Sequence, residues 1–191
     1  MIMSAVFYTP AVIALRGVDV VRVPLRAWGP GFLSAVGLEQ RMLRRSVQTP
    51  TGAFTISEAG GAIVRATWEA GWSDRSPLLD RAEAQLRAYF DHRLDIFDLP
   101  MAPQVSDVSK RFLAALQAIP FGQTRTYGDL AKEVGVSAQA AGQLCGSNPI
   151  AILIPCHRVL GANGLGGFSG AGGVETKMAL LRHEGAAGIL I

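Results

Sequence analysis

Cysteine is scarce in this sequence, which has only Cys145 and Cys156 among its 191 residues. Two cysteines cannot build the disulfide framework of a small secreted domain, and no Cys-x-x-Cys pair is present. A cysteine-rich zinc site is therefore excluded, and we expect neither a metal nor any other cofactor. The two thiols are more typical of a reduced protein that works in the cytoplasm.

Long apolar runs are also lacking. No stretch reaches the roughly 18 apolar residues that a membrane-spanning helix needs. The first residues carry no positive charge ahead of their apolar part, as a secretory signal would. We therefore expect neither a membrane partner nor a signal peptide.

Lysine is also scarce, since only three of the 18 basic residues are Lys and the others are Arg. The formal net charge is still +3. A positive balance favours an anionic partner, and nucleic acid is one candidate.

What the sequence does contain suits a folded protein, because 49% hydrophobic and 17% charged residues are typical of globular chains. Residues 1–47 differ from the rest, since proline, glycine and arginine recur there without a sustained period. We expect this segment, with Arg41, Arg44 and Arg45, to be an atypical and poorly ordered extension.

Residues 48–103 have the pattern of a small α/β domain. Phe54 and Ile56 alternate with polar residues, and a second β-rich run follows Gly60 and Gly61. Two such runs around a glycine pair predict a β-hairpin.

A helix is predicted to begin at Pro77, where apolar residues start to recur at the helical period. Its expected buried face consists of Leu79, Ala82, Leu86 and Phe90. A short polar stretch near residue 103 then marks the boundary to a second, more helical domain over residues 104–191.

Three helices are predicted in the second domain, because Ser106, Thr126 and Ser137 each stand at a capping position before an apolar pattern. Gly135 ends the second of these helices shortly before the third begins. Two short helices joined by a tight turn are the sequence form of a helix-turn-helix.

The third of these helices, "SAQAAGQLCG", has one thin and polar face. Its members follow the spacing i, i+3, i+4, i+7 and are Gln139, Gly142, Gln143 and Gly146. Such a face suits close approach to a surface. An ordinary exposed helix with tolerated glycines explains it equally well.

A possible reactive group occurs in "ILIPCHRVLG", where Cys156 stands between an apolar run, expected to be a buried strand, and His157. A thiol is nucleophilic as its thiolate, and a nearby histidine can take its proton. From spacing alone, a buried cysteine beside an unrelated histidine explains the pair more simply.

The longer segment "NPIAILIPCHRV" closely resembles the active-site signature of the O6-alkylguanine-DNA alkyltransferases, also called methylated-DNA-protein-cysteine methyltransferases. The resemblance runs from about residue 49 to residue 185. It includes "TPTGAFTI", "LLDRAEAQLRAYF", "IPFGQTRTYGDLA", "GLGGFSG" and "LLRHEG".

This resemblance implies a fold and an activity. It indicates an N-terminal ribonuclease-H-like α/β domain over residues 48–103 and a C-terminal winged helix-turn-helix domain over residues 104–191. Family members bind double-stranded DNA through the minor groove and flip the damaged guanine out of the stack. The alkyl group of O6-alkylguanine then moves irreversibly to a cysteine of the protein, and O4-alkylthymine is a further candidate substrate. We expect such a protein to act as a monomer without a cofactor.

Matching positions carry the family's chemical roles over to this sequence. Cys156 resembles the alkyl acceptor, His157 the base that deprotonates it through a bound water, and Glu184 the carboxylate that orients the histidine. Asn148 matches the asparagine that ties a turn to the active-site backbone. Tyr127 matches the tyrosine that donates toward the guanine ring.

The same resemblance indicates residues that touch substrate and DNA. Ser169 is expected near the O6 atom of guanine, with Gly167 and Phe168 beside it, and the carbonyl of Val159 near the exocyclic amine. Arg158 is expected to hold local structure only. The expected DNA contacts on the third helix are Ser137, Gln139, Gly142 and Gln143. Taken singly, most of these residues are explained more simply as turn or surface residues, and their joint order around one Pro-Cys-His-Arg core favours the functional interpretation.

Two departures from the family pattern keep alternatives open. Gln139 stands where an arginine normally fills the space left by the flipped base, and the segment after Ser169 is about two residues longer than usual. One alternative is a non-repairing, alkyltransferase-like protein that only recognises alkylated DNA, although the retained Cys156 argues against it. Another is a cysteine hydrolase, for which no oxyanion hole is indicated.

Overall fold

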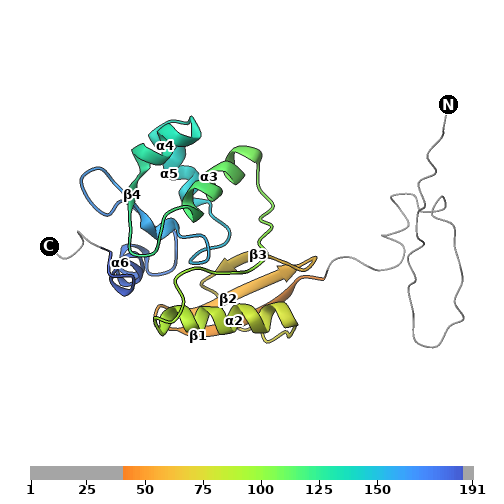
Figure 1. The fold of residues 1–191 in the computed structure, drawn as a ribbon. Helices are drawn as coiled ribbons and strands as arrows, with labels where there is room; N and C mark the ends of the chain where they lie inside the picture. Colours follow the sequence, from red (N-terminus) through yellow and green to blue (C-terminus); the bar gives the residue numbers. More distant parts are fainter. Residues whose placement is uncertain (1–40, 187–191) are drawn as a thin grey trace, which may run out of the picture. The chain divides into compact units, whose positions relative to one another are not determined.

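A three-stranded antiparallel sheet is formed by β1 (Leu43–Thr49), β2 (Gly52–Ala59) and β3 (Ala62–Thr67) in the computed structural model, which describes residues 41–186. Its strand order is β1-β2-β3 (Figure 1). Gly60 and Gly61 join β2 to β3 with φ angles of 59° and 77°, which favour glycine. The predicted hairpin is confirmed.

Strand β1 corrects the expected boundary of the N-terminal extension, because residues 43–47 belong to the sheet. Arg45 stands opposite Ile56 in the register, and its side chain pairs with Asp80 and with Glu83, whose Oε2 lies 2.6 Å from Nε. The strand was missed because its polar side chains find partners on a distant helix rather than showing an alternating apolar pattern. The expectation for residues 1–40 lies outside the described residues.

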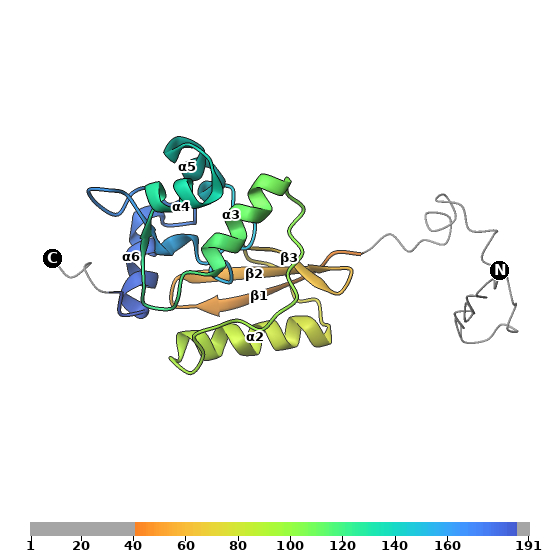
Figure 2. The same cartoon turned by 45° about the horizontal axis from the view of Figure 1, so that its top comes forward.

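Helix α2 (Pro77–Phe90) covers one face of this sheet (Figure 2). Ser76 caps it by accepting a hydrogen bond from the Leu79 backbone nitrogen at 3.0 Å. Its buried residues are Leu79, Ala82, Leu86 and Tyr89. The prediction was right for the first three, but Tyr89 is fully buried whereas Phe90 is only half-buried. Both positions continue the helical period, so spacing alone could not choose between them.

The three helices predicted in the second half are present as α3 (Asp107–Gln117), α4 (Tyr127–Val134) and α5 (Ala138–Gly146). Ser106, Thr126 and Ser137 are their N-caps, as predicted. Helix α4 ends at a left-handed Gly135, with φ 77°, and packs against α5.

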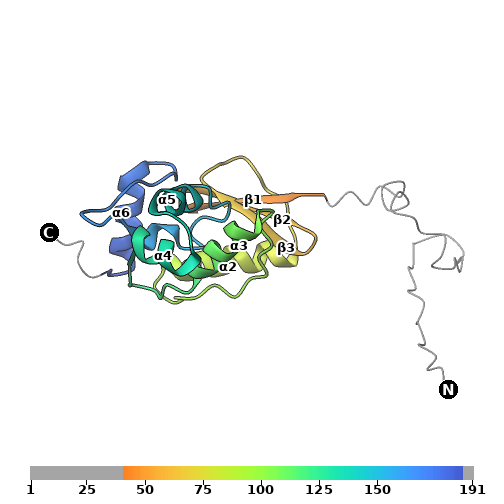
Figure 3. The same ribbon diagram turned by 90° about the horizontal axis from the view of Figure 1, so that it is seen from above.

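The remaining elements are short except for the last helix. Strand β4 (Arg125–Thr126) pairs in parallel with β5 (Val159–Leu160). A single turn of 3-10 helix, η2 (Cys156–Arg158), precedes β5, and α6 (Gly173–His183) follows it. Figures 1, 2 and 3 show α6 and the start of β1 at opposite ends of the fold.

The apolar run before Cys156 is buried as predicted, but it forms a compact turn rather than a strand. Ile152 has a left-handed φ of 65°, and the Ile154 backbone nitrogen donates to the carbonyl of Ile150 at 3.0 Å. The turn is joined to β3, since the backbone nitrogen of Ala151 donates to Ala66 at 2.9 Å. Periodicity cannot distinguish a short buried strand from a short buried turn.

One continuous apolar core extends from the sheet and α2 to α3, α5 and the turn before Cys156. Its largest fully buried side chains include Phe54, Leu86, Phe112 and Ile150. The described residues from Met42 onward belong to one compact unit of mixed α/β structure. Within this part of the chain, no helix has the length and apolar character needed to cross a membrane.

Candidate active site

Cys156 opens onto a cavity of about 410 Å³. It is the first residue of η2, and its side chain is buried. The cavity is formed by the start of α4, one face of α5 and the loop before α6. Its lining residues are Tyr127, Gly142, Cys145, Gly146, Cys156, Gly167, Phe168 and Ser169. A cavity of this volume is large enough for one small planar ligand.

Two glycines make the α5 wall of this cavity thin. An added Cβ at Gly142 or Gly146 would meet no atom within 4 Å, so the bare backbone borders open space. The loop before α6 forms the opposite wall. It is joined to α5, because the Ser169 hydroxyl group donates to the carbonyl of Gly146 at 2.9 Å. The Tyr127 hydroxyl group donates to the carbonyl of Gly167 at 3.3 Å.

Lys177 fixes the loop that forms this second wall. Its buried ammonium group donates to the carbonyls of Val159 at 2.6 Å and Gly167 at 3.2 Å, and also to Leu165. Burial lowers the pKa of Lys177. Because three backbone carbonyls converge on one ammonium group, the loop is held against α6.

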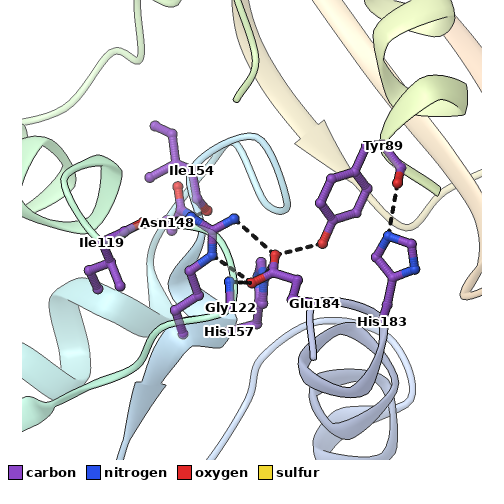
Figure 4. A network of polar contacts seen from close by, with 9 residues as sticks. Tyr89, Ile119, Gly122, Asn148, Ile154, His157, His183 and Glu184 are labelled. Atoms are coloured by element: carbon purple, nitrogen blue, oxygen red, sulfur yellow. Dashed lines mark hydrogen bonds and ion pairs between the residues drawn. The ribbon is translucent and has the colours of Figure 1, made fainter. Parts of the chain in front are cut away.

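The Glu184 carboxylate is the centre of a buried polar network that includes His157, the residue after Cys156 (Figure 4). Its Oε1 accepts hydrogen bonds from His157 Nε2 at 2.8 Å, the Tyr89 hydroxyl group at 2.7 Å and Arg158 Nη2 at 2.9 Å. Its Oε2 accepts from Arg158 Nε at 2.8 Å and the Gly122 backbone nitrogen at 3.4 Å. This number of donors indicates an ionised carboxylate.

The protonation states of Glu184 and His157 follow from these contacts. Burial alone would raise the pKa of Glu184, but hydrogen bonds from His157 and Arg158 and their charges hold that pKa well below its ordinary value. Burial also lowers the pKa of His157, although Glu184 opposes this effect. A neutral imidazole beside a carboxylate carries its proton on Nε2, which leaves Nδ1 as the basic nitrogen. Nδ1 is buried and has no hydrogen-bond partner within residues 41–186.

The second cysteine lies beside the first. Cys145 Sγ lies 3.6 Å from the backbone carbonyl oxygen of Cys156. A hydrogen bond from Cys145 lowers the pKa of the Cys156 thiol, burial opposes it, and the Asn148 side chain lowers it further. The same pairing raises the pKa of Cys145, so Cys156 is the thiol that ionises more readily.

Asn148 holds the turn that delivers Cys156. Its Nδ2 donates to the carbonyl of Ile154 at 2.9 Å, and its Oδ1 accepts from the Ile150 backbone nitrogen at 3.1 Å. The side chain thus bridges both ends of the turn in place of strand pairing. The resemblance to the alkyltransferase family implied such a link between a turn and the active-site backbone.

Comparison with known proteins identifies the family. Residues 107–186 match the model of the DNA-binding domain of 6-O-methylguanine DNA methyltransferase. A methylated-DNA–protein-cysteine methyltransferase from Methanosarcina acetivorans is 43% identical over 118 residues, covering 60% of this chain and 74% of the relative. One from Mycolicibacterium paratuberculosis is 38% identical over 151 residues, covering 73% and 90%. This chain belongs to the methylated-DNA–protein-cysteine methyltransferase family.

Solved methyltransferase structures share the fold. The crystal structure of the Mycobacterium tuberculosis O6-methylguanine methyltransferase matches with a TM-score of 0.68 at 35% identity, covering 76% of this chain and 93% of that one. A structure of the M. tuberculosis protein in complex with DNA matches with a TM-score of 0.66 at 36% identity, covering 74% and 92%.

The structure brings together most of the residues that the resemblance to this methyltransferase family indicated. Tyr127, Gly142, Cys156, Gly167, Phe168 and Ser169 line one cavity. His157, which follows Cys156 in the chain, contacts Glu184.

Other expected site residues lie away from the cavity. Val159 is not among the lining residues, and its carbonyl accepts a hydrogen bond from Lys177. Gln139 and Gln143 are exposed on α5 but do not line the cavity. The Ser137 hydroxyl group accepts from the Ala140 backbone nitrogen at 3.1 Å and so caps α5. The expected contacts of these residues with substrate and DNA stay predictions.

Several residues of the methyltransferase site were not selected from the sequence: Tyr89, Cys145 and Lys177. A signal for Lys177 was present, because Lys177, Leu180, Leu181 and Glu184 follow the spacing i, i+3, i+4, i+7 along α6. Two charged residues on an otherwise apolar helix face indicate buried charges with specific partners. Arg158 was expected to hold local structure, and its Nη1 donates to the carbonyl of Ile119 at 2.6 Å.

Proposed function

We propose that this methyltransferase repairs alkylated DNA by moving the alkyl group of O6-alkylguanine, typically methyl, to Sγ of its own Cys156. The observation that supports this best is the position of Cys156. It opens onto a base-sized cavity, next to a thiol that favours its ionisation, and the residue after it, His157, is paired with Glu184. The family membership of the chain agrees with this reaction.

The transfer is a direct displacement. The Cys156 thiolate attacks the alkyl carbon, an S–C bond forms, and the bond between that carbon and O6 of guanine breaks. The proton of the thiol passes to His157 Nδ1 through a water molecule, and Glu184 stabilises the resulting imidazolium. The product is a thioether, which is not hydrolysed, so each molecule acts once.

The leaving guanine gains negative charge that must be neutralised. We assign this to the Tyr127 hydroxyl group, which lines the cavity and would donate to the bound guanine ring in place of the Gly167 carbonyl. Burial raises the pKa of Tyr127 to about 12, and nearby Cys145 contributes, so the hydroxyl group remains protonated near neutral pH. Ser169 borders the same cavity, where it stabilises the charge on O6.

For DNA binding, we propose that α4 and α5 form a helix-turn-helix and that the loop before α6 forms the wing of a winged domain over residues 104–191. The sheet and α2 then form a ribonuclease-H-like domain that ends near residue 103. The exposed face of α5, with Ser137, Gln139, Gly142 and Gln143, would enter the minor groove of double-stranded DNA. Support comes from the position of this face beside the cavity, since a flipped base must travel between the two.

We further propose that the protein acts as a monomer, because one chain supplies every residue of the proposed site. A thiol acceptor also requires reducing surroundings, such as the cytoplasm. The alternative of a non-repairing protein that only recognises alkylated DNA is not favoured, because Cys156 is retained at the cavity.

Mass spectrometry tests the proposed function. The protein is incubated with duplex DNA that carries O6-methylguanine and then digested. We expect the Cys156 peptide to gain about 14 Da, as one methyl group replaces the thiol hydrogen. The Cys156→Ala variant should bind the same DNA without a mass gain. Tight binding by the wild-type protein with no gain would instead support the damage-recognition alternative.

A further inference from the structure

We propose that Tyr89 is a positioning residue of the methyl acceptor site: its hydroxyl group holds the Glu184 carboxylate and limits how strongly that carboxylate retains a proton on His157. Tyr89 belongs to α2, far from the signature around Cys156 in the sequence. The first half of the chain thus supplies a residue to the chemistry of the second. The inference rests on the proposed function, in which His157 accepts the proton of Cys156.

The geometry places Tyr89 and His157 on the same carboxylate oxygen. The Tyr89 hydroxyl group donates to Glu184 Oε1 at 2.7 Å, and His157 Nε2 meets this atom at 2.8 Å. All three side chains are almost fully buried. Figure 4 shows Tyr89 reaching Glu184 from α2. Water therefore does not replace either donor, and the two compete for the charge of one oxygen.

Aromatic packing fixes the Tyr89 ring in this direction. The rings of Phe90, Phe97 and Phe121 lie 5.0, 5.4 and 6.0 Å from it, measured between centroids. His183 Nε2 lies 2.9 Å from the Tyr89 backbone carbonyl. Burial and the neighbouring Glu184 raise the pKa of the Tyr89 hydroxyl group, so it stays a donor across the working pH range.

Several other charged or titratable groups surround His157 and Glu184. Arg158 contacts both carboxylate oxygens, and Lys177 of α6 acts on the imidazole as a further positive charge. His183 of α6 and the Cys156 thiol are the other titratable groups nearby. Apart from His157 itself, Tyr89 is the donor to Oε1 that carries no charge, so removing its hydroxyl group leaves the total charge of the site unchanged.

Removing the Tyr89 hydroxyl group has a defined effect on proton transfer. Oε1 loses one of three donors and becomes a stronger acceptor for His157, which stabilises the imidazolium and raises the pKa of His157. An imidazolium next to Cys156 favours the thiolate and lowers the pKa of that thiol. The acid limb of the alkylation profile should therefore move to lower pH, while the plateau changes little.

The test compares Tyr89→Phe with wild type by the rate at which iodoacetamide alkylates Cys156, measured across pH. This reagent needs no DNA. We expect the acid limb of Tyr89→Phe to lie about half a pH unit lower, so that the rate on that limb rises roughly threefold. Phe97→Leu is the matched control, because it alters the packing of the Tyr89 ring without removing a hydrogen bond. Superimposable profiles of Tyr89→Phe and wild type, or an equal shift in Phe97→Leu, would overturn the inference.

A second measurement covers the case in which Tyr89→Phe does not fold. Fluorotyrosine, incorporated in the Tyr127→Phe background, makes the Tyr89 hydroxyl group a stronger donor and should move the acid limb to higher pH. An unchanged limb would contradict the role of Tyr89. Wild-type protein that reacts with iodoacetamide but gains no methyl group from O6-methylguanine DNA would instead refute the proposed function and leave the positioning role to be judged by the iodoacetamide profiles.

Discussion

At the scale of single residues, Glu184 shows how one buried charge can be both tolerated and useful. Four residues donate to its carboxylate, namely His157, Arg158, Tyr89 and Gly122. An isolated buried carboxylate would be costly, but the Arg158 guanidinium and the neutral donors offset that cost. Gly122 is required here, because its φ is 73° and an added Cβ would lie 2.9 Å from the Glu184 carbonyl.

Cys145 is a residue whose effect on the acceptor can be measured directly. In Cys145→Ala, the Cys156 thiolate loses a hydrogen-bond donor, so the pKa of Cys156 should rise. We expect the rate of Cys156 alkylation by iodoacetamide at pH 7 to fall about threefold to tenfold, with little change at high pH where the thiol is ionised in both proteins.

Cys145→Ser is the matched control for this prediction. A serine hydroxyl group keeps a donor at the same position, so its rate at pH 7 should stay closer to wild type. A rate in Cys145→Ala equal to wild type at every pH would show that the second thiol does not assist the first.

At the scale of elements, α5 combines a wall of the cavity with an exposed polar face. Gly142 and Gly146 border the cavity, whereas Gln139 points away from the core on the same helix. Lining the cavity and the proposed contact with DNA both need small side chains on this helix, since bulky ones would separate the DNA from the cavity. The low helix propensity of glycine is offset by the Ser137 cap and by the burial of Ala141.

Gln139→Arg should speed methyl transfer from duplex DNA by a few fold, because an arginine adds charge attraction to phosphates and a longer side chain to fill the space left by a flipped base. The measurement is the rate of mass gain on the Cys156 peptide at several salt concentrations. The salt dependence of binding should steepen by about one phosphate contact.

Gln117→Arg, on the exposed side of α3, has the same change in net charge and serves as the control. If both variants accelerate transfer equally, general charge rather than the position of Gln139 explains the effect. No acceleration in Gln139→Arg would remove Gln139 as the cause of any difference from relatives with an arginine.

Sequence reasoning recovered the elements whose signals are local. The caps Ser106, Thr126 and Ser137 are read directly, because each satisfies backbone groups within its own helix. Strand β1 and the turn before Cys156 were missed, since both are defined by partners far away in the sequence. The same holds for the site. The signature predicted Cys156 from neighbouring residues, whereas Tyr89 belongs to the site only through its contact with the distant Glu184.

At the scale of the whole molecule, buried ionisable groups link stability to pH. The pKa of Glu184 is below its ordinary value in the folded protein, and the pKa values of His157 and His183 are also lowered. For all three, the unfolded chain binds a proton at a higher pH than the folded chain does. Their contribution to stability is therefore present at neutral pH and is lost as pH falls.

We expect the free energy of unfolding to decline from about pH 6.5, where unfolded histidines bind protons, and more steeply below about pH 4.5, where unfolded Glu184 does. The slope should approach about 1.4 kcal/mol per pH unit for each proton taken up. Urea unfolding at a series of pH values measures it. The Glu175→Gln variant, which removes an exposed carboxylate of α6, should keep the slope. A stability that stays flat from pH 7 to 4 would contradict this account.

The hydrogen bonds between β3 and the turn before Cys156 bear on whether the two halves are interchangeable modules. Ala66 donates to the carbonyl of Pro149 at 2.8 Å and accepts from Ala151 at 2.9 Å, so the sheet acts as a template for the acceptor turn. A hybrid that joins this second half to the sheet of another relative would have to reproduce that backbone contact. The first half is therefore a part of the reactive centre that cannot be exchanged freely, although none of its residues from 41 onward lines the cavity.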